Sequence, residues 1–355
     1  MAMVKANAYG HGMIECARVL RSEGVEYLGV AFAEEGQALR QSGDAGNILV
    51  LSPPLPQEAE MFCEYNLEFV ACDAEVLQAF NTAAQTRNVR LNAHVYIDTG
   101  MHRDGIFAAE AAAFADKLRR CSHLEFRGLC THFAHADAAD KSFTLQQLSL
   151  FNRAAETLKQ AGHRFDLLHA ANTAAMSDIA ASHFSLVRLG ISLYGYPASA
   201  EIAQPPSVRP VLELRARVNA LRTIEAGETV SYGRRYTAQQ RELIATLSLG
   251  YGDGLMRSLS NRGHCLIGGR LFDLVGTICM DECMARVDDS VRTGDEVVII
   301  GRQGDLTIGA DRVAAEAGTI AYEVLAGISA RVPRHYSDHT EAASGIVNQS
   351  REFGT

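Results

Sequence analysis

The chain has 355 residues, of which 47% are hydrophobic and 21% are charged. This length accommodates about two domains of ordinary size, and the composition excludes a disordered or collagen-like chain. The net charge of −9 at pH 7 argues against nucleic acid or an anionic membrane as the main partner, because both attract clustered Lys and Arg. No uninterrupted apolar run reaches the ~18 residues that a membrane span requires, so we expect no membrane partner.

The first part of the chain alternates short β-branched runs with amphipathic helical stretches. The expected strands lie at residues 3–5, 27–32, 47–52, 68–71, 92–98, 126–133, 166–171 and 186–191. The expected helices include residues 34–42, 74–87, 108–120 and 145–162. Such alternation favours parallel strands joined by helical crossovers. Eight strands in this length predict an α/β fold of the TIM (β/α)8 barrel type, with an open, doubly wound sheet as the alternative.

The pattern changes after residues 196–210, which hold four of the chain's eight prolines and read as a linker. Strand-like runs follow at residues 242–249, 265–274, 277–287 and 295–300, with one helical stretch at residues 310–317. We therefore expect a TIM barrel over residues 1–200, a C-terminal mostly-β domain over residues 211–340, and a polar tail over residues 341–355.

Eight cysteines are scattered along the chain without the spacing of a disulfide framework. This pattern is typical of reduced thiols, and no signal peptide pattern is visible, so we expect a cytoplasmic protein. Cys279 and Cys283 lack a second Cys/His pair at zinc spacing, so we expect no metal.

Charged and polar residues occupy the positions where the barrel strands end, which is where TIM barrels carry their chemistry. These residues are Lys5, Arg103, His132, Asn172, Thr173 and Arg188. Together they predict an anion-binding pocket with an amine that could serve as a nucleophile. Desolvation lowers the pKa of a lysine and makes it available for Schiff-base chemistry, although on position alone a lysine that extends to solvent is the more frequent case.

A series of motifs favours the Schiff-base interpretation of Lys5 over a lysine that extends to solvent. In chain order they are VKANAYGHG at residues 4–12, DTGMHR at 98–103, THFA at 131–134, HAANT at 169–173, VRLGI at 187–191, GYGDG at 250–254, ICMDEC at 278–283 and AYEV at 321–324. Each motif alone is weak, but their order and spacing resemble the alanine racemase family over nearly the whole chain. That family pairs a TIM barrel that binds pyridoxal 5'-phosphate (fold type III) with a C-terminal β domain.

The resemblance implies two catalytic bases on opposite faces of one α-carbon. Lys5 would bind the cofactor and act as one base, and Tyr251 would be the other. Because a phenol has an unperturbed pKa of ~10, it needs help at neutral pH. His132, with Arg188 behind it, would supply that help. Without the resemblance, a turn aromatic at the domain edge would be the simpler interpretation of Tyr251.

The resemblance also assigns the contacts to cofactor and substrate. Arg188 would face the pyridine nitrogen and, because it only donates, leave that nitrogen unprotonated. A rim salt bridge, for example with Asp166, is the structural alternative. The phosphate and cofactor contacts would come from Tyr9, Asn172, Thr173, Gly190, Ile191 and Tyr322. The substrate contacts would come from Arg103, Met280 and Asp281.

In the family, the β domain of one subunit completes the site of the other, so we expect an obligate homodimer with shared active sites. The implied activity is interconversion of L- and D-alanine, which supplies D-alanine for peptidoglycan. Serine or broader amino-acid specificity is the nearest alternative. A non-catalytic pyridoxal-phosphate-binding barrel and an inactive, truncated racemase are the others.

The sequence departs from the family pattern in three places. Family members usually carry further residues ahead of the lysine motif, so we expect a shortened chain or a replacement of those elements. Tyr96 stands where many members have a lysine whose carbamate orients the arginine, so another group must hold Arg103. Asp104 stands where an apolar residue is common, which adds a carboxylate beside Arg103.

Overall fold

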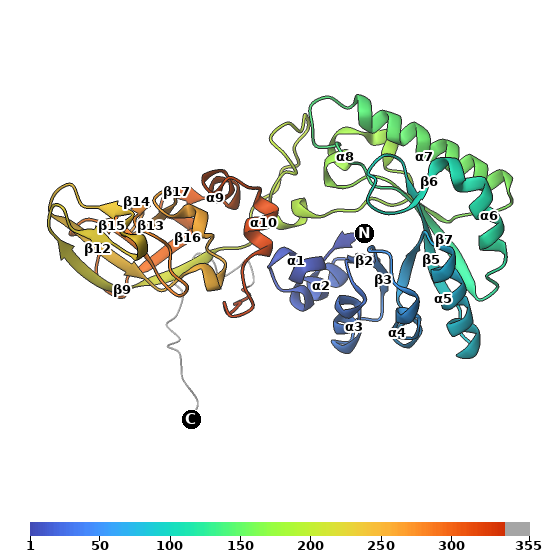
Figure 1. Ribbon diagram of the computed structural model, residues 1–355, viewed down its shortest axis with the longest axis horizontal. Helices are drawn as coiled ribbons and strands as arrows, with labels where there is room; N and C mark the ends of the chain where they lie inside the picture. Colours follow the sequence, from blue (N-terminus) through green and yellow to red (C-terminus); the bar gives the residue numbers. More distant parts are fainter. Residues whose placement is uncertain (338–355) are drawn as a thin grey trace.

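The computed structural model describes residues 1–337. The chain forms two parts, a parallel α/β barrel and an antiparallel β domain, with helix α10 (Ala321–Ala326) between them in Figure 1. None of the helices in this described region is long and apolar enough to cross a membrane.

The first sheet is parallel along its main path and contains the expected barrel strands. In spatial order they are β1 (Ala2–Met3), β2 (Tyr27–Val30), β3 (Asn47–Val50), β4 (Glu68–Ala71), β5 (Leu91–Asp98), β7 (Leu124–Cys130) and β8 (Leu167–His169). The short β6 (Ile106–Phe107) pairs with β5 outside this path.

Residues 187–189 close the parallel sheet. The Arg188 amide donates to Ala171 O at 3.0 Å, next to β8, and the Met3 amide donates to Leu189 O at 2.8 Å, on the β1 side. A single parallel bridge joins Ala2 to Leu189. The expected strand at residues 186–191 is therefore reduced to this short seam, because Ile191 already begins a 3-10 turn, η4 (Ile191–Tyr194).

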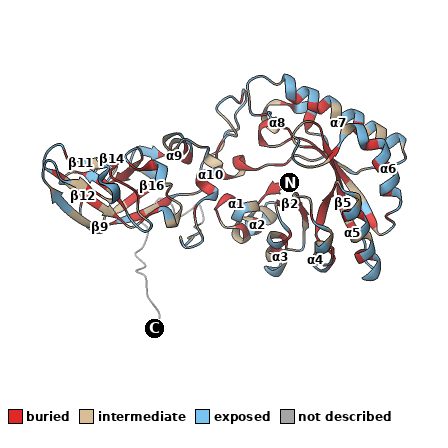
Figure 2. Cartoon of the chain, in the orientation of Figure 1, coloured by how far each residue is buried: buried red, intermediate tan, exposed pale blue. Residues whose placement is uncertain are grey.

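Helices cover the outer face of the barrel and alternate with its strands. They are α2 (Met13–Ser22), α3 (Ala33–Gln41), α4 (Ala59–Tyr65), α5 (Ala74–Thr86), α6 (Ala111–Arg119), α7 (Ser142–Gln160) and α8 (Thr173–Asp178). In α5, Asp73 Oδ1 caps the first turn by accepting from the amides of Glu75 and Val76. Apolar side chains such as Phe80 lie on its buried face, and Figure 2 shows this buried-inside, exposed-outside pattern around the barrel.

The second sheet is antiparallel. Its order is β13 (His264–Ile267), β14 (Arg270–Leu274), β15 (Cys283–Val287), β12 (Glu242–Leu247), β9 (Leu214–Ile224), β16 (Glu296–Gln303) and β17 (Leu306–Ile308). Because β13 also pairs with β16, the strands from β13 to β16 form a closed ring. A small hairpin of β10 (Thr229–Val230) and β11 (Tyr236–Thr237) and the helix α9 (Ala310–Ala317) complete this domain.

Two expected strands of the β domain differ from the structure. Residues 265–274 form the β13–β14 hairpin rather than one strand, because Gly268 and Gly269 adopt φ of +59° and +74°. In the run 277–287, only Cys283–Val287 is a strand, and the preceding residues form a loop. The predicted tail at residues 341–355 lies outside the described residues.

The β domain packs on the segment that follows β1. Arg334 Nη2 donates to Gly10 O at 2.9 Å, and Tyr336 donates from its hydroxyl to His11 O at 3.1 Å. Gly10 has φ +83°, and a Cβ there would meet Leu325 O of α10 at 2.0 Å, so only glycine fits. The lysine motif is thus fixed from the β-domain side.

Candidate active site

Lys5 begins α1 (Lys5–Tyr9), an unusual turn at the end of β1. Ala6, Asn7, Ala8 and Tyr9 all have φ between 52° and 54°, the left-handed region. This region costs about 1–2 kcal/mol per residue for L-amino acids, so the surroundings must hold the turn in place. Glu35 Oε1 accepts from the Ala6 amide at 2.6 Å, and Asn7 Oδ1 accepts from the Met13 amide at 2.8 Å. Such strained segments concentrate at functional sites.

The Lys5 amine lies among positive charges. Partial burial lowers its pKa, and the charges of Arg103 and Arg188 lower it further, against an opposing effect of Glu35. The environment therefore favours the neutral amine, the form that can attack a carbonyl or take up a proton.

Arg188 is a buried guanidinium, 5% exposed, fixed by neutral acceptors. Its Nη1 donates to His169 Nδ1 at 2.7 Å and to His169 O at 3.0 Å. Its Nη2 donates to Thr131 O at 2.7 Å, Ala170 O at 2.9 Å and His132 Nδ1 at 3.2 Å. Within residues 1–337 it forms no salt bridge, so the rim pair with Asp166 is absent, and its Nε–H has no protein acceptor.

The contact with Arg188 also fixes the state of His132. Because a guanidinium only donates, His132 Nδ1 must accept, which leaves its proton on Nε2. Burial and the charges of Arg188, Arg103 and Lys5 lower the pKa of this imidazole to about 3. His132 is therefore a neutral ring with one N–H available to donate.

Arg103 lies on a loop built by Asp98 at the end of β5. Asp98 Oδ1 accepts from the amides of Gly100, Met101 and His102 at 2.9, 3.0 and 3.1 Å. Arg103 Nε donates to Asp104 Oδ2 at 3.0 Å, and the side chain stays largely exposed, so its guanidinium can also reach a ligand. The Asp104 carboxylate, which is absent from the usual family pattern, thus forms an ion pair with Arg103.

Tyr96 lies beside the Arg103 guanidinium, 5% exposed. Burial and neighbouring Cys130 raise the pKa of Tyr96 to about 12, so its phenol keeps its proton. Asp104 and a neutral phenol therefore stand where many family members use a carbamate.

A second group of predicted residues surrounds Gly190. Thr173 Oγ1 accepts from the Gly190 amide at 2.8 Å, so this amide is already paired. A Cβ on Gly190 would lie 2.7 Å from the Tyr9 hydroxyl, and the rings of Tyr9 and Tyr322 are 6.0 Å apart. Within residues 1–337 neither of these two hydroxyls has a protein hydrogen-bond partner. Burial raises the pKa of Tyr9 to about 12, which keeps it a donor.

Asn172 serves the same region indirectly. Its Oδ1 accepts from the Ala175 amide at 3.0 Å, which caps the first turn of α8 and places Thr173 at its start. Ile191 is fully buried at the start of η4.

Tyr251 lies on the β domain, in the 3-10 turn η6 (Tyr251–Asp253), and is 43% exposed. Its amide donates to Cys279 O at 2.9 Å, and the Gly252 amide donates to Met280 O at 2.9 Å. Arg331 pairs with Asp253 at 2.7 Å and with Asp281 at 2.9 Å. Tyr251, Met280 and Asp281 therefore form one exposed edge of the β domain.

The structure thus gathers the predicted residues into two sets. Lys5, Arg103, His132 and Arg188 share the end of the barrel with the residues around Gly190. Tyr251, Met280 and Asp281 occur together on the β domain. In the described part of the chain, no hydrogen bond or ion pair joins the two sets.

Some residues that support the site were not predicted. Asp98 and Glu35 build the Arg103 and Lys5 loops, and His94 and Glu68 lie behind Arg188. The available signal was the alternation of polar residues with apolar ones along β5 and at the start of β4, which is unusual in a buried sheet.

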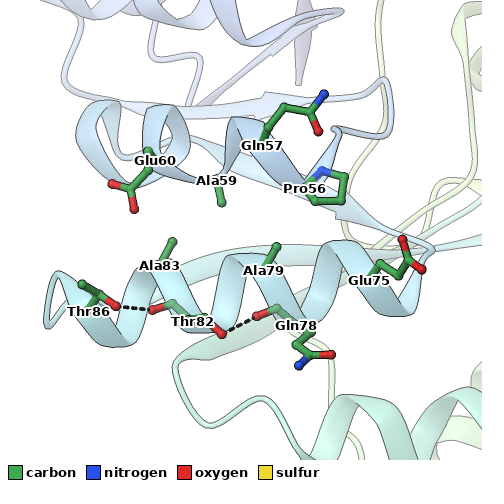
Figure 3. Close-up of a pocket in the computed structure, with 10 residues that line it drawn as sticks. All are labelled: Pro56, Gln57, Ala59, Glu60, Glu75, Gln78, Ala79, Thr82, Ala83 and Thr86. Carbon is green, nitrogen blue, oxygen red and sulfur yellow. Dashed lines mark hydrogen bonds between the residues drawn. The ribbon is translucent and has the colours of Figure 1, made fainter.

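A surface groove lies elsewhere, away from the strand ends. It separates α4 from α5 on the outside of the barrel, where Ala59 faces Ala79 and Ala83 (Figure 3). None of its lining residues belongs to the predicted site, so the candidate chemistry lies at the strand ends and not in this groove.

A parallel barrel that gathers a lysine, a histidine and two arginines at its strand ends, followed by an antiparallel β domain, defines the two-domain racemases, a class of isomerases. The chain belongs to the alanine racemase family. It matches the family models "Alanine racemase, N-terminal domain" over residues 1–198 and "Alanine racemase, C-terminal domain" over residues 211–336.

Individual relatives agree with this assignment. Alanine racemase of Symbiobacterium thermophilum is 42% identical over 342 residues, covering 96% of this chain and 91% of that protein. Alanine racemase of Bacillus anthracis with bound L-Ala-P superposes with a TM-score of 0.91 at 34% identity, covering 96% of this chain and 88% of the other. Histidine racemase of Leuconostoc mesenteroides superposes with a TM-score of 0.87 at 28% identity, covering 95% and 91%.

Proposed function

We propose that this protein interconverts L- and D-alanine with pyridoxal 5'-phosphate, in the cytoplasm, and supplies D-alanine for peptidoglycan. The observation that carries the proposal is the state of Arg188. This buried guanidinium has satisfied both Nη groups and retains one N–H beside a lysine amine of lowered pKa.

The residues at the barrel end fit the cofactor. Arg188 Nε–H is a donor in need of an acceptor, which a pyridine nitrogen provides. Within the described residues the Tyr9 and Tyr322 hydroxyls have no protein hydrogen-bond partner, so both can donate to a phosphate, and Thr173 lies beside Tyr9. Lys5, at the end of β1, supplies the amine that can bind the aldehyde covalently.

When bound, pyridoxal phosphate supplies the electron sink that makes the α-proton of an amino acid removable. Lys5 Nζ takes or returns that proton on one face of the α-carbon. Tyr251 acts on the opposite face, and the proton that one base removes is matched by one that the other delivers. The Nε2–H of His132 is suited to donate to the Tyr251 oxygen, which favours the phenolate.

Arg188 limits the reaction to proton exchange. A guanidinium does not lose its proton, so Arg188 cannot protonate the group that it faces. This leaves a weaker electron sink and favours return of the α-proton over side reactions. Arg103, through its exposed guanidinium, binds the substrate carboxylate, with Met280 and Asp281 beside the substrate.

We infer that the second base comes from another subunit. Tyr251 is exposed, and within residues 1–337 no hydrogen bond or ion pair joins it to Lys5, Arg103, His132 or Arg188 of its own chain. A homodimer that places the exposed Tyr251 edge of each copy over the barrel end of the other completes two shared sites.

The side-chain specificity has one alternative. A histidine racemase shares this fold, and the Asp104–Arg103 pair adds a carboxylate near the substrate, so serine or broader specificity is the second candidate. The β domain with Tyr251 argues against a non-catalytic barrel.

Solvent-deuterium incorporation tests the proposal. Full-length protein loaded with pyridoxal phosphate is incubated in deuterated water with L-alanine, D-alanine, L-serine or L-histidine. We expect α-deuterium in both alanine enantiomers and faster turnover of L-alanine than of the other amino acids. Preference for serine would overturn the alanine assignment, and a coloured protein without exchange would indicate a non-catalytic binder.

A further inference from the structure

A continuous chain of hydrogen bonds runs from Arg188 into the core of the barrel. Arg188 Nη1 donates to His169 Nδ1 at 2.7 Å, His169 Nε2 lies 2.8 Å from His94 Nδ1, and His94 Nε2 lies 2.9 Å from Glu68 Oε2. The exposed fractions of Arg188, His169, His94 and Glu68 are 5%, 0%, 0% and 4%. Buried polar groups are costly unless every one is satisfied, and here each is paired with the next.

The two ends of this chain determine the direction of every bond in it. Arg188 can only donate, so His169 Nδ1 accepts and the His169 proton sits on Nε2. That N–H donates to His94 Nδ1, which places the His94 proton on Nε2. The last N–H donates to the Glu68 carboxylate, which can only accept while it is ionised. A second proton on His169 is disfavoured, because burial, Arg188 and His94 hold its pKa well below the ordinary value.

Successive layers of the barrel place these residues one step apart. Glu68 begins β4, and the next residue, Phe69, is paired with Ala93. His94 is paired with Gly128, and His169 is paired with Cys130, one layer nearer the strand ends. The hydrogen-bonded chain therefore runs along the inside of the barrel, from the start of β4 to Arg188.

The backbone is adapted to hold this relay. A Cβ at Gly128 would lie 2.0 Å from His94 Nδ1, so glycine is required for the ring to fit. The β5–β7 register shifts beside His94, which makes Arg127 an extra residue in β7. Arg127 Nη1 lies 3.4 Å from Glu68 Oε1, so the bulge supplies the counter-charge for the buried carboxylate.

Other donors complete the environment of Glu68. The Tyr27 hydroxyl donates to both carboxylate oxygens at 3.2 and 3.3 Å, and Asn92 Nδ2 donates at 3.3 Å. The carboxylate is thus a fully satisfied acceptor at the far end of the barrel from Lys5.

We propose that Glu68, His94 and His169 form a one-directional relay that fixes the orientation of the Arg188 guanidinium and holds its free Nε–H toward the cofactor site. This inference rests on the proposed role of Arg188. Glu68 and His94 are positioning residues, because they act through His169 and Arg188 and do not touch the substrate.

The first experiment measures the relay in the unsubstituted protein. Two-bond proton–nitrogen spectra of the full chain, labelled with 15N-histidine and free of cofactor, report the tautomer of each ring. Single His→Asn substitutions assign the signals. We expect His94 and His169 each to show only the Nε2–H tautomer at neutral pH. An Nδ1–H tautomer or a doubly protonated ring at either position would overturn the proposal.

The second experiment uses Glu68→Gln, which removes the charge at nearly constant size. We expect the nitrogen signals of His169 to shift, although Glu68 does not contact His169. In the loaded enzyme we expect kcat for alanine to fall about fivefold or more with KM within about twofold, because orientation of Arg188 and not substrate binding is disturbed.

Phe69→Leu is the matched control. Phe69 is fully buried on the same strand, next to Glu68, and its ring packs on the opposite, helix-covered face against Phe62 and Phe80. A general loss of packing in β4 would be felt there as well. We expect Phe69→Leu to leave the His169 signals in place and kcat within about twofold of the parent.

The outcomes separate this proposal from the proposed function. If Glu68→Gln leaves kcat and the His169 signals unchanged, or if Phe69→Leu changes both equally, the relay does not position Arg188. If Glu68→Gln fails to fold, the tautomers of the unsubstituted protein still decide whether the relay exists. If the unsubstituted protein does not racemise alanine, the proposed function fails, whereas the tautomer result stands by itself.

Discussion

At the residue scale, the chemistry of Lys5 depends on its neighbours. Partial burial, Arg103 and Arg188 all act to lower the pKa of this amine. An ordinary surface lysine is almost fully protonated at neutral pH, with an unperturbed pKa of about 10.4. Burial and the same two arginines also lower the pKa of His132, to about 3, so the positive charge at this end of the barrel disfavours protonation of both groups.

Lys5→Ala tests the first of these groups. Because the covalent attachment point is lost, we expect the visible absorbance of bound pyridoxal phosphate and the racemase activity to disappear together. Absorbance spectra and alanine turnover measure both. Lys117→Ala, on the outer helix α6, is the control and should change neither. Retained activity in Lys5→Ala would contradict the assigned role.

Tyr251→Phe tests the second base. The substitution keeps the ring but removes the proton carrier, so the cofactor absorbance should persist. We expect exchange of the α-proton to slow by about a hundredfold or more from one alanine enantiomer and much less from the other. The control is Tyr232→Phe, at another exposed tyrosine of the β domain. Equal, mild losses from both enantiomers would argue against a two-base scheme.

At the element scale, the left-handed turn after Lys5 is the most unusual local structure. Asn tolerates this conformation better than most residues, and its side chain here bonds the Met13 amide. Asn7→Ala should therefore lower the free energy of unfolding by about 1 kcal/mol, whereas Ala6→Gly should raise it by about 0.5 kcal/mol. Urea unfolding measures both. Changes of the same sign would contradict a strained turn.

Regular elements were the part of the fold most accessible from the sequence. Residues 68–71 and 310–317 were predicted as a strand and a helix, and the structure gives them these bounds. Strand β9 (Leu214–Ile224) was missed, although buried Leu214, Ala216 and Val218 alternate with more exposed polar residues, which is the pattern of a half-buried strand. The seam at residues 187–189 was predicted too long, because sequence alternation does not report how many ladder bonds form.

The candidate site likewise contains residues that were predicted from the sequence and residues that were missed. The motifs assigned roles to Lys5 and Arg188, because their order and spacing resemble the alanine racemase family, and these assignments remain predictions. The relay behind Arg188 went unrecognised, since a single histidine in a strand such as His94 resembles an ordinary core residue. Only the pairing of β5 with β7 and β8 brings it into line with His169.

At the scale of the whole molecule, buried neutral histidines make stability depend on pH. Burial is the main cause that lowers the pKa values of His11, His132 and His169. In the unfolded chain these rings bind protons below pH ~6.5, whereas in the folded protein they do not until lower pH, about 3 for His132. Their contribution to stability is therefore complete above pH ~6.5 and is lost as the pH falls.

Because its folded pKa is about 3, the His132 ring should reduce the free energy of unfolding by about 1.4 kcal/mol per pH unit once the pH is well below 6.5 and still above 3. Urea unfolding between pH 7 and 5, at fixed protein concentration, measures the slope. His132→Asn should make the slope of the unfolding free energy against pH smaller by the contribution of the His132 ring. An unchanged slope in this variant would show that His132 is not held neutral by the fold.

The seam that closes the barrel links distant parts of the chain. The Tyr194 hydroxyl donates to Met3 O across 191 residues, and the Met3 amide donates to Leu189 O. Contacts of such high sequence separation are slow to form, so we expect barrel closure to be a late event in folding. Lys5 and Arg188 lie next to this seam, because Lys5 follows Met3 on one side and Arg188 precedes Leu189 on the other. The ability to bind cofactor should therefore be acquired only in the final folding step, and cofactor colour would report the yield of correctly closed molecules during synthesis.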